Sequence, residues 1–237
     1  MKVDLVFSAD MINEEVSEGK TAIVIDTLRA TSTIIKALDS GAERVIPVLS
    51  IKEAKKHRSS LGQNYLICGE RGGIKVDGFD LGNSPRSYLP EVLSSKVVVL
   101  TTTNGTRCFS RLANAQEVLV ASLLNIKAII DYIKEKEEIL FCCAGIRGDF
   151  ALDDFITAGA IISRLKERDL NLSDEALVAK SFYLQHKNDL LDLLKCSRSG
   201  QNLIKLGKEA DIDYIYNETE IKLLPLYKDG SIIKQEG

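Results

Sequence analysis

Short apolar runs alternate with longer amphipathic segments through the first two thirds of the chain. The short runs are rich in Val, Ile and Leu and predict strands at residues 3–7, 22–26, 44–49, 65–68, 97–101, 117–121 and 138–143. The segments between them have helical spacing and predict helices at 31–40, 51–61, 106–113, 125–136 and 152–168. Buried strands that alternate with helices are typical of βαβ units. We therefore predict a three-layer α/β/α fold with a mostly parallel sheet.

The pattern changes after residue 173. Helix-like segments follow at 173–195 and 199–209, and the turn Asp229-Gly230 between two apolar runs predicts a β-hairpin. We expect the whole chain, 1–237, to form a single α/β catalytic domain, with C-terminal helices and the hairpin in 173–237.

The first part of the chain resembles a duplication with a period of about 75 residues. The segments AIVIDTLRATSTIIKAL, ERVIPVLSIKEAKK and YLICGERGG correspond in order to VVVLTTTNGTRCFSRL, QEVLVASLLNIKAIID and ILFCCAGIRGD. We predict pseudo-repeats at about 22–73 and 97–149, so the sheet could be built from two similar βαβαβ units. The alternative is chance, because any two βαβ stretches share such features.

Composition and charge exclude several partners. The 237 residues carry a net charge of −3, so no overall basic field exists to hold nucleic acid or an anionic membrane. Five cysteines without a CxxC pair fit a reducing compartment. We therefore expect a cytoplasmic protein with a small-molecule partner and no nucleic-acid or membrane partner. A homo-oligomer stays open.

Candidate chemistry begins where the strand at 22–26 ends. Asp26 closes the strand, Arg29 follows in the turn, and Thr31 or Ser32 could cap the next helix. A carboxylate, a guanidinium group and a helix N-terminus together suit a metal ion and an oxyanion. The alternative is that Asp26 only caps the turn and Arg29 is solvated.

Three more turns combine polar residues with glycine. TTTNGTR, at 101–107, offers hydroxyl and backbone N–H groups that could surround an anion, although it could also be a Thr-rich edge with a helix cap. CGERGG, at 68–73, and CCAGIRGD, at 142–149, follow two other strands, and their glycines let the backbone approach a ligand. Because such turns meet at the carboxyl edge of a parallel sheet, we predict that Arg29, Arg71 and Arg147 converge on one pocket.

Asp153-Asp154 opens the helix at 152–168. Adjacent acids suit Mg²⁺, although acids are also common in a first helical turn. No Cys-x5-Arg and no Gly-x-Ser-x-Gly is present. The nucleophile therefore stays open between water activated by a carboxylate, Asp26 and Cys143.

Five segments in order resemble the 2-phosphosulfolactate phosphatase family of the coenzyme M pathway. They are VIDTLRATST, CGERGG, GNSP, TTTNGT, and CAG with the following DDFITAGA. The resemblance implies an α/β fold and Mg²⁺-dependent hydrolysis of (R)-2-phospho-3-sulfolactate to sulfolactate and phosphate. It leaves open which phosphorylated 2-hydroxy acid is the physiological substrate.

The residues and the resemblance together give the predicted site. The catalytic candidates are Asp26, Arg29, Arg147 and Cys143. The substrate-binding candidates are Thr31, Ser32, Arg71, Gly72, Gly73, Asn104, Gly105, Thr106 and Gly145. The Mg²⁺ candidates are Asp26, Glu70, Asp153 and Asp154. The alternative functions are a Mg²⁺-dependent lyase or isomerase acting on a small anionic hydroxy acid, and a non-catalytic module that binds a phosphorylated metabolite.

Overall fold

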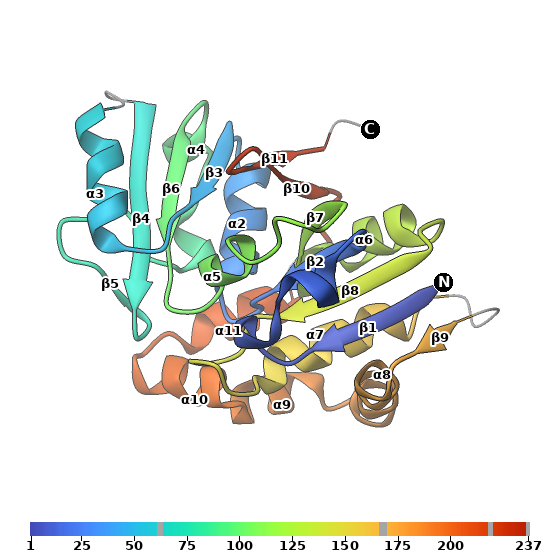
Figure 1. Ribbon diagram of the computed structural model, residues 1–237. Helices are drawn as coiled ribbons and strands as arrows, with labels where there is room; N and C mark the ends of the chain where they lie inside the picture. The colour runs from blue at the N-terminus through green and yellow to red at the C-terminus, as the bar shows by residue number, and fades with distance from the viewer. Residues whose placement is uncertain (61–63, 166–169, 218–219, 236–237) are drawn as a thin grey trace.

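A computed structural model describes residues 1–60, 64–165, 170–217 and 220–235. The described residues form one eleven-stranded, mostly parallel sheet in the order β5-β4-β6-β3-β11-β10-β7-β2-β8-β1-β9 (Figure 1). The strands are β1 (Lys2–Val6), β2 (Thr21–Ile25), β3 (Arg44–Pro47), β4 (Tyr65–Arg71), β5 (Ile74–Lys75), β6 (Val97–Thr101), β7 (Glu117–Ala121), β8 (Glu138–Cys143), β9 (Asn171–Leu172), β10 (Pro225–Lys228) and β11 (Ser231–Lys234).

Helices cover both faces of this sheet. They are α1 (Glu14–Ser17), α2 (Ala30–Asp39), α3 (Ile51–Ser60), α4 (Pro90–Leu93), α5 (Thr106–Phe109), α6 (Ile126–Ile133), α7 (Leu152–Ile162), α8 (Asp174–His186), α9 (Leu190–Cys196), α10 (Arg198–Lys205) and α11 (Glu209–Asn217). Alternate strand residues separate the two faces: Val24 packs with α2, whereas Ile23 and Ile25 pack with α6, α7 and α8. The architecture is therefore the predicted three-layer α/β/α sandwich.

The sheet consists of two parallel halves joined by an antiparallel hairpin. β4, β6 and β3 run parallel in one half, and β7, β2, β8, β1 and β9 in the other. Between them, β11 and β10 pair antiparallel with β3, with each other and with β7. These three antiparallel steps make the two halves run in opposite directions. Strand twist then turns the arrowheads of β4 and β8 toward a common region (Figure 1).

The two predicted pseudo-repeats interleave in this sheet. β2, from the first repeat, lies between β7 and β8 of the second, and β6, from the second, lies between β3 and β4 of the first. The pairings are equivalent, because Cys68 pairs with Leu100 and Cys143 pairs with Ile25. The turns that follow β2 and β6 consequently meet at the centre of the molecule.

The predicted elements differ from the observed ones mainly in length. The segment 173–195 divides into α8 and α9, the helix predicted at 106–113 shortens to α5, and β4 extends three residues past the strand predicted at 65–68. Residue 61 of the predicted helix 51–61 and residues 166–168 of the predicted helix 152–168 lie outside the described residues. The predicted hairpin is present as β10 and β11, whose turn places Asp229 and Gly230 at positive φ.

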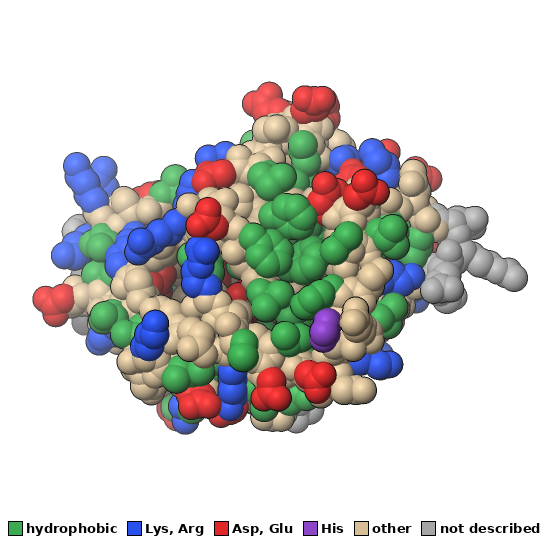
Figure 2. All heavy atoms as spheres, turned by 90° about the horizontal axis from the view of Figure 1, so that it is seen from below, with side chains coloured by type: hydrophobic (Ala, Val, Ile, Leu, Met, Phe, Trp, Pro, Cys, Tyr) green, Lys and Arg blue, Asp and Glu red, His purple; other side chains and the backbone are tan. Residues whose placement is uncertain are grey.

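One face of the molecule carries an apolar patch. Figure 2 shows hydrophobic side chains gathered on the underside, where α8 lies. Four large apolar side chains are each about half exposed: Phe150, Leu177, Val178 and Leu184. The ring of Phe150 also contacts the buried ring of Phe155. Across the part of the chain that the structure describes, no helix is both long enough and apolar enough to cross a membrane.

Candidate active site

A cavity of about 390 Å³ lies where the carboxyl ends of the two sheet halves meet. Its walls come from the turns after β2, β4, β6 and β8, from the turn containing Asn83, and from α10. The lining residues are Asp26, Leu28, Arg29, Glu70, Gly72, Gly73, Asn83, Thr103, Asn104, Ile146, Arg147, Arg198, Ser199, Asn202 and Leu203. Both pseudo-repeats and the C-terminal helices therefore contribute to one site.

Asp26 is a buried carboxylate on the cavity wall. Its Oδ1 accepts a hydrogen bond from the Ala30 backbone N–H, at 3.0 Å, so it caps the first turn of α2. Burial, with repulsion from the nearby Asp153 and Glu70 carboxylates, raises the pKa of Asp26 to about 7 against backbone hydrogen bonds that lower it. Asp26 can thus gain or lose a proton near neutral pH.

Asp153 is a second buried carboxylate beside Asp26. Its Oδ2 accepts a hydrogen bond from the Leu28 N–H at 3.3 Å, whereas its buried Oδ1 has no partner among the described residues. Burial raises the pKa of Asp153 to about 6, and backbone N–H groups and the Ser199 hydroxyl act in the opposite direction. A buried oxygen without a partner is costly, which makes Oδ1 a candidate ligand for a cation.

Asp154 and Glu70 each accept backbone hydrogen bonds from two turns and so link the turns around the cavity. Asp154 accepts hydrogen bonds from Thr27 N–H at 2.9 Å and from Gly145 N–H at 3.1 Å. Burial, with repulsion from Asp153, raises the pKa of Asp154. Glu70 accepts from Gly73 N–H at 2.6 Å and from Thr103 N–H at 2.7 Å. In both side chains, each oxygen already accepts a backbone hydrogen bond.

The acids predicted to bind Mg²⁺ do not form a cage made by the protein alone. Within the described ranges, no three His, Cys, Asp or Glu side chains are arranged to hold a metal ion. Each carboxylate oxygen of Glu70 and Asp154 already accepts a backbone N–H group, and the role of these two residues as Mg²⁺ ligands stays a prediction. Asp26 and Asp153 fit Mg²⁺ in another way, because this ion commonly takes one or two carboxylates and completes its shell with water and substrate phosphate.

Arg29 is an organising residue rather than a free anion binder. Its Nη1 lies 2.6 Å from Asp211 Oδ2 in a buried ion pair, and its Nη2 donates to the Gly73 carbonyl oxygen at 3.0 Å. Arg29 lines the cavity as predicted. Its guanidinium group also ties α11 to the glycine turn after β4, and its contact with a substrate anion stays a prediction.

The predicted convergence of Arg29, Arg71 and Arg147 is wrong for Arg71. Because β4 extends to Arg71, that side chain turns back along the strand, where it donates to the Glu70 carbonyl oxygen at 2.6 Å and to Thr101 Oγ1 at 2.9 Å. Arg147 does line the cavity, in an exposed turn fixed by its N–H bond to Asn104 Oδ1 at 3.0 Å. Arg198, from α10, joins it at the mouth.

Several predicted site residues are structural instead. Cys143 lies in the core on β8, and burial raises the pKa of its thiol, so it does not reach the cavity as a nucleophile. The hydroxyl groups of Thr31, Ser32 and Thr106 donate to the backbone carbonyls of Asp26, Thr27 and Thr102 and do not line the cavity.

Some of the predicted glycines line the cavity, and others have packing roles away from it. Gly72, Gly73 and the neighbouring Asn104 line the cavity. Gly105 instead allows two turns to touch, since a Cβ there would lie 2.7 Å from Asp26 Oδ2. Gly145, at φ +69°, donates its N–H to Asp154 and packs against the Asp149 carbonyl oxygen.

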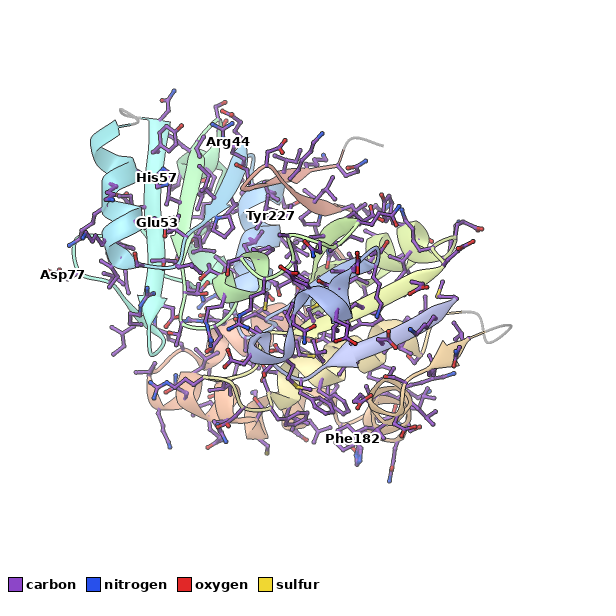
Figure 3. All side chains as sticks on the ribbon, viewed as in Figure 1. Arg44, Glu53, His57, Asp77, Phe182 and Tyr227 are labelled. Carbon is purple, nitrogen blue, oxygen red and sulfur yellow. The ribbon has the colours of Figure 1, made fainter. Side chains whose placement is uncertain are left out.

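The sequence prediction missed the side of the cavity made by later segments. Asn83, Arg198, Ser199 and Asn202 all line it. The available signals were the long polar loop at 73–95 and the segment SRSGQNLIKLG, but neither reveals which strand ends it covers. Neither histidine lines the cavity: His57 lies on α3 and His186 on α8, next to Phe182 (Figure 3).

The fold and the cavity define an α/β enzyme with buried carboxylates and arginines at one small-molecule site. The profile of the 2-phosphosulpholactate phosphatase family matches residues 6–230. A Thermotoga petrophila protein is 46% identical over 219 residues, which cover 92% of this chain and 94% of that protein. A Clostridium acetobutylicum protein is 39% identical over 236 residues, which cover 98% of this chain and 100% of that protein.

Both of these relatives carry the name probable 2-phosphosulfolactate phosphatase. A Clostridium perfringens protein of the same name is 43% identical over 237 residues, which cover 98% of this chain and 96% of that protein. The chain belongs to the 2-phosphosulpholactate phosphatase family, a family of phosphoric monoester hydrolases. The resemblance found in the sequence is thereby confirmed.

Proposed function

We propose that this chain is a Mg²⁺-dependent phosphatase that hydrolyses 2-phospho-3-sulfolactate, or a closely related 2-hydroxy-acid phosphate, to the hydroxy acid and phosphate. The names of its relatives support this substrate. The observation that carries the proposal is the buried pair Asp26 and Asp153, whose pKa values of about 7 and about 6 lie near neutral, beside a cavity with two arginines at its mouth.

The charges of the cavity suit such a substrate. Phosphosulfolactate carries a phosphate, a carboxylate and a sulfonate on three carbons, and a chain of net charge −3 must meet these groups locally. Arg147 and Arg198 present guanidinium groups at the mouth, where their paired N–H donors match carboxylate or sulfonate oxygens. Arg198 also bonds Asp149 Oδ2 at 3.0 Å in an exposed pair, which a substrate anion could replace at little cost.

The carboxylate pair would act on the phosphate end. Asp26 and Asp153 are the residues that would hold Mg²⁺, which when bound would neutralise charge on the phosphoryl group. Water attacks phosphorus, the bond between phosphorus and the C2 oxygen breaks, and the carboxylate pair takes up the proton of the water. The leaving oxygen gains a proton from solvent. Burial of the Cys143 thiol in the core, which raises its pKa, supports water rather than Cys143 as the nucleophile.

Phosphate release tests this function. We expect the purified chain to release phosphate from (R)-2-phospho-3-sulfolactate with Mg²⁺, and to stop when EDTA is added. Against 2-phospholactate, which lacks the sulfonate, kcat/KM should be at least tenfold lower. Arg147→Lys keeps the positive charge but loses the paired N–H donors of the guanidinium group. It should therefore reduce the difference in kcat/KM between the two substrates. Binding without turnover would favour the metabolite-binding module, and loss of phosphate by elimination would favour a lyase.

A further inference from the structure

Asn83 lies on the cavity wall and has an unpaired, buried amide oxygen. The side chain lines the cavity and is only 4% exposed, and its buried Oδ1 has no hydrogen-bond partner among the described residues. Buried polar atoms are almost always paired, so an exception at a ligand cavity indicates a partner that arrives with the ligand. Asn83 was not among the residues that the sequence assigned to the site.

The loop that carries Asn83 is held firmly. The Tyr88 hydroxyl donates to the Gly82 carbonyl oxygen at 2.8 Å, and Thr33 Oγ1 donates to the Asn83 carbonyl oxygen at 3.2 Å. On the other side, Ser84 Oγ donates to Asp211 Oδ1 at 2.7 Å. The Gly82 and Asn83 carbonyl oxygens and the Ser84 side chain are thus anchored, so the loop has a defined place on the wall.

Helix α2 relates Asn83 to Asp26. The Ala30 N–H at the start of α2 bonds the Asp26 carboxylate, and Thr33, three residues later, bonds the backbone of Asn83. Three helical residues rise about 4.5 Å, so the two anchoring points are less than one helical turn apart. Asn83 and Asp26 also line the same cavity.

The chemistry of the amide oxygen selects its partner. An ionised phosphosulfolactate has three anionic groups and no hydrogen-bond donor, so it cannot satisfy a lone acceptor. Amide and carboxylate oxygens are hard ligands that suit Mg²⁺. We propose that Asn83 Oδ1 is a neutral ligand of the divalent cation, next to Asp26. This inference rests on the cation requirement of the proposed function and adds a ligand to it.

Direct cation binding without substrate tests the inference. Free Mn²⁺ would be followed by electron paramagnetic resonance as it is added to the metal-free full chain. Asn83→Leu should weaken the dissociation constant for Mn²⁺ at least tenfold, whereas Asn83→Asp, which keeps the oxygen and adds charge, should retain or tighten it. Asn188→Leu is the control: Asn188 is exposed between α8 and α9 and does not line the cavity, so Mn²⁺ affinity should not change.

Each other outcome has a clear meaning. Unchanged Mn²⁺ affinity in a folded Asn83→Leu variant overturns the assignment, and a raised KM with that unchanged affinity moves Asn83 to substrate binding. If Asn83→Leu does not fold, the test uses Asn83→Asp. A weaker affinity of that variant for Mn²⁺ would then overturn the ligand assignment. The absence of saturable Mn²⁺ binding in the unaltered chain also overturns it. A chain that binds Mn²⁺ as expected but releases no phosphate contradicts the proposed function and leaves the ligand assignment standing.

Discussion

Two adjacent acids at the start of α7 have different environments. Asp153 uses one oxygen for the Leu28 N–H and leaves the other unpaired, whereas Asp154 uses one oxygen for Thr27 and one for Gly145. An amide can replace the first side chain without loss of its one hydrogen bond. It cannot replace the second, because an NH₂ group would then face a backbone N–H donor.

Matched asparagine variants should therefore separate catalysis from stability. Asp153→Asn should change the free energy of unfolding at pH 5, where Asp153 is mostly protonated, by less than about 1 kcal/mol. It should lower kcat/KM about 100-fold, which is about 2.7 kcal/mol of transition-state stabilisation. Asp154→Asn should lower the free energy of unfolding by about 1–3 kcal/mol. Urea unfolding and steady-state phosphate release measure the two effects. The reverse pattern would exchange the roles of the two acids.

The raised pKa values also predict how stability depends on pH. In the folded chain the pKa is about 7 for Asp26 and about 6 for Asp153, whereas both are near 3.8 in the unfolded chain. The folded state binds these protons more tightly, so the stability they contribute is complete below pH 3.8 and is lost as pH rises through 6 to 7.

We expect the metal-free chain to lose about 1–3 kcal/mol more stability between pH 5 and pH 8 than Asp153→Asn loses. Urea unfolding at both pH values, in the presence of a chelator, gives the comparison. Because other carboxylates titrate equally in both chains, the difference isolates Asp153 and its neighbour. Identical pH dependence of stability in the two chains would mean that folding does not raise the pKa values of Asp26 and Asp153.

At the scale of elements, the buried pair of Arg29 and Asp211 joins the C-terminal helices to the site. Asp211 on α11 reaches the Arg29 guanidinium group and the Ser84 hydroxyl, so three segments distant in sequence meet at one carboxylate. Asp211→Ala leaves a buried guanidinium group without its partner and should cost about 3–5 kcal/mol of stability.

Double replacement provides the control for this pair. Arg29→Met with Asp211→Leu removes both charges and should recover part of the loss, because an apolar pair costs less than one unpaired buried charge. Thermal and urea unfolding compare the three chains. A single variant Asp211→Ala that loses less than about 1 kcal/mol would show that α11 docks without the ion pair.

The alternation of apolar and polar positions identified most elements, because that pattern is local. The turn residues Asp26, Glu70, Gly72 and Arg147 were also found from sequence, since each follows a strand. The pattern could not assign Arg71 to its strand, because β4 continues through a glycine that interrupts the apolar run. Nor could it place Asn202 at the cavity, because docking of α10 depends on contacts with distant segments.

For the whole molecule, the order of strands was beyond a local pattern. Ile25 pairs with Cys143 and Leu100 pairs with Cys68, so each repeat completes the sheet of the other. The sequence predicted one carboxyl edge for all the polar turns. The structure instead brings two opposed carboxyl ends together, because the hairpin of β10 and β11 adds three antiparallel pairings between the halves.

Interleaving predicts a single cooperative unfolding transition. Removing either repeat would take a central strand from both halves, so neither half is expected to stay folded when the other unfolds. The far-ultraviolet circular dichroism and tyrosine fluorescence of the chain should give the same urea midpoint. Two separated midpoints would show that the halves fold as independent units.

The central claim is that the cation and the substrate meet in the cavity between the two halves. A crystal structure of the chain soaked with Mn²⁺, sulfolactate and phosphate tests it most directly, since Mn²⁺ can be located by its anomalous scattering. The account predicts Mn²⁺ against Asp26, Asp153 and Asn83, the phosphate on that ion, and the sulfolactate anions against Arg147 and Arg198. Mn²⁺ bound elsewhere, or product outside this cavity, would contradict it.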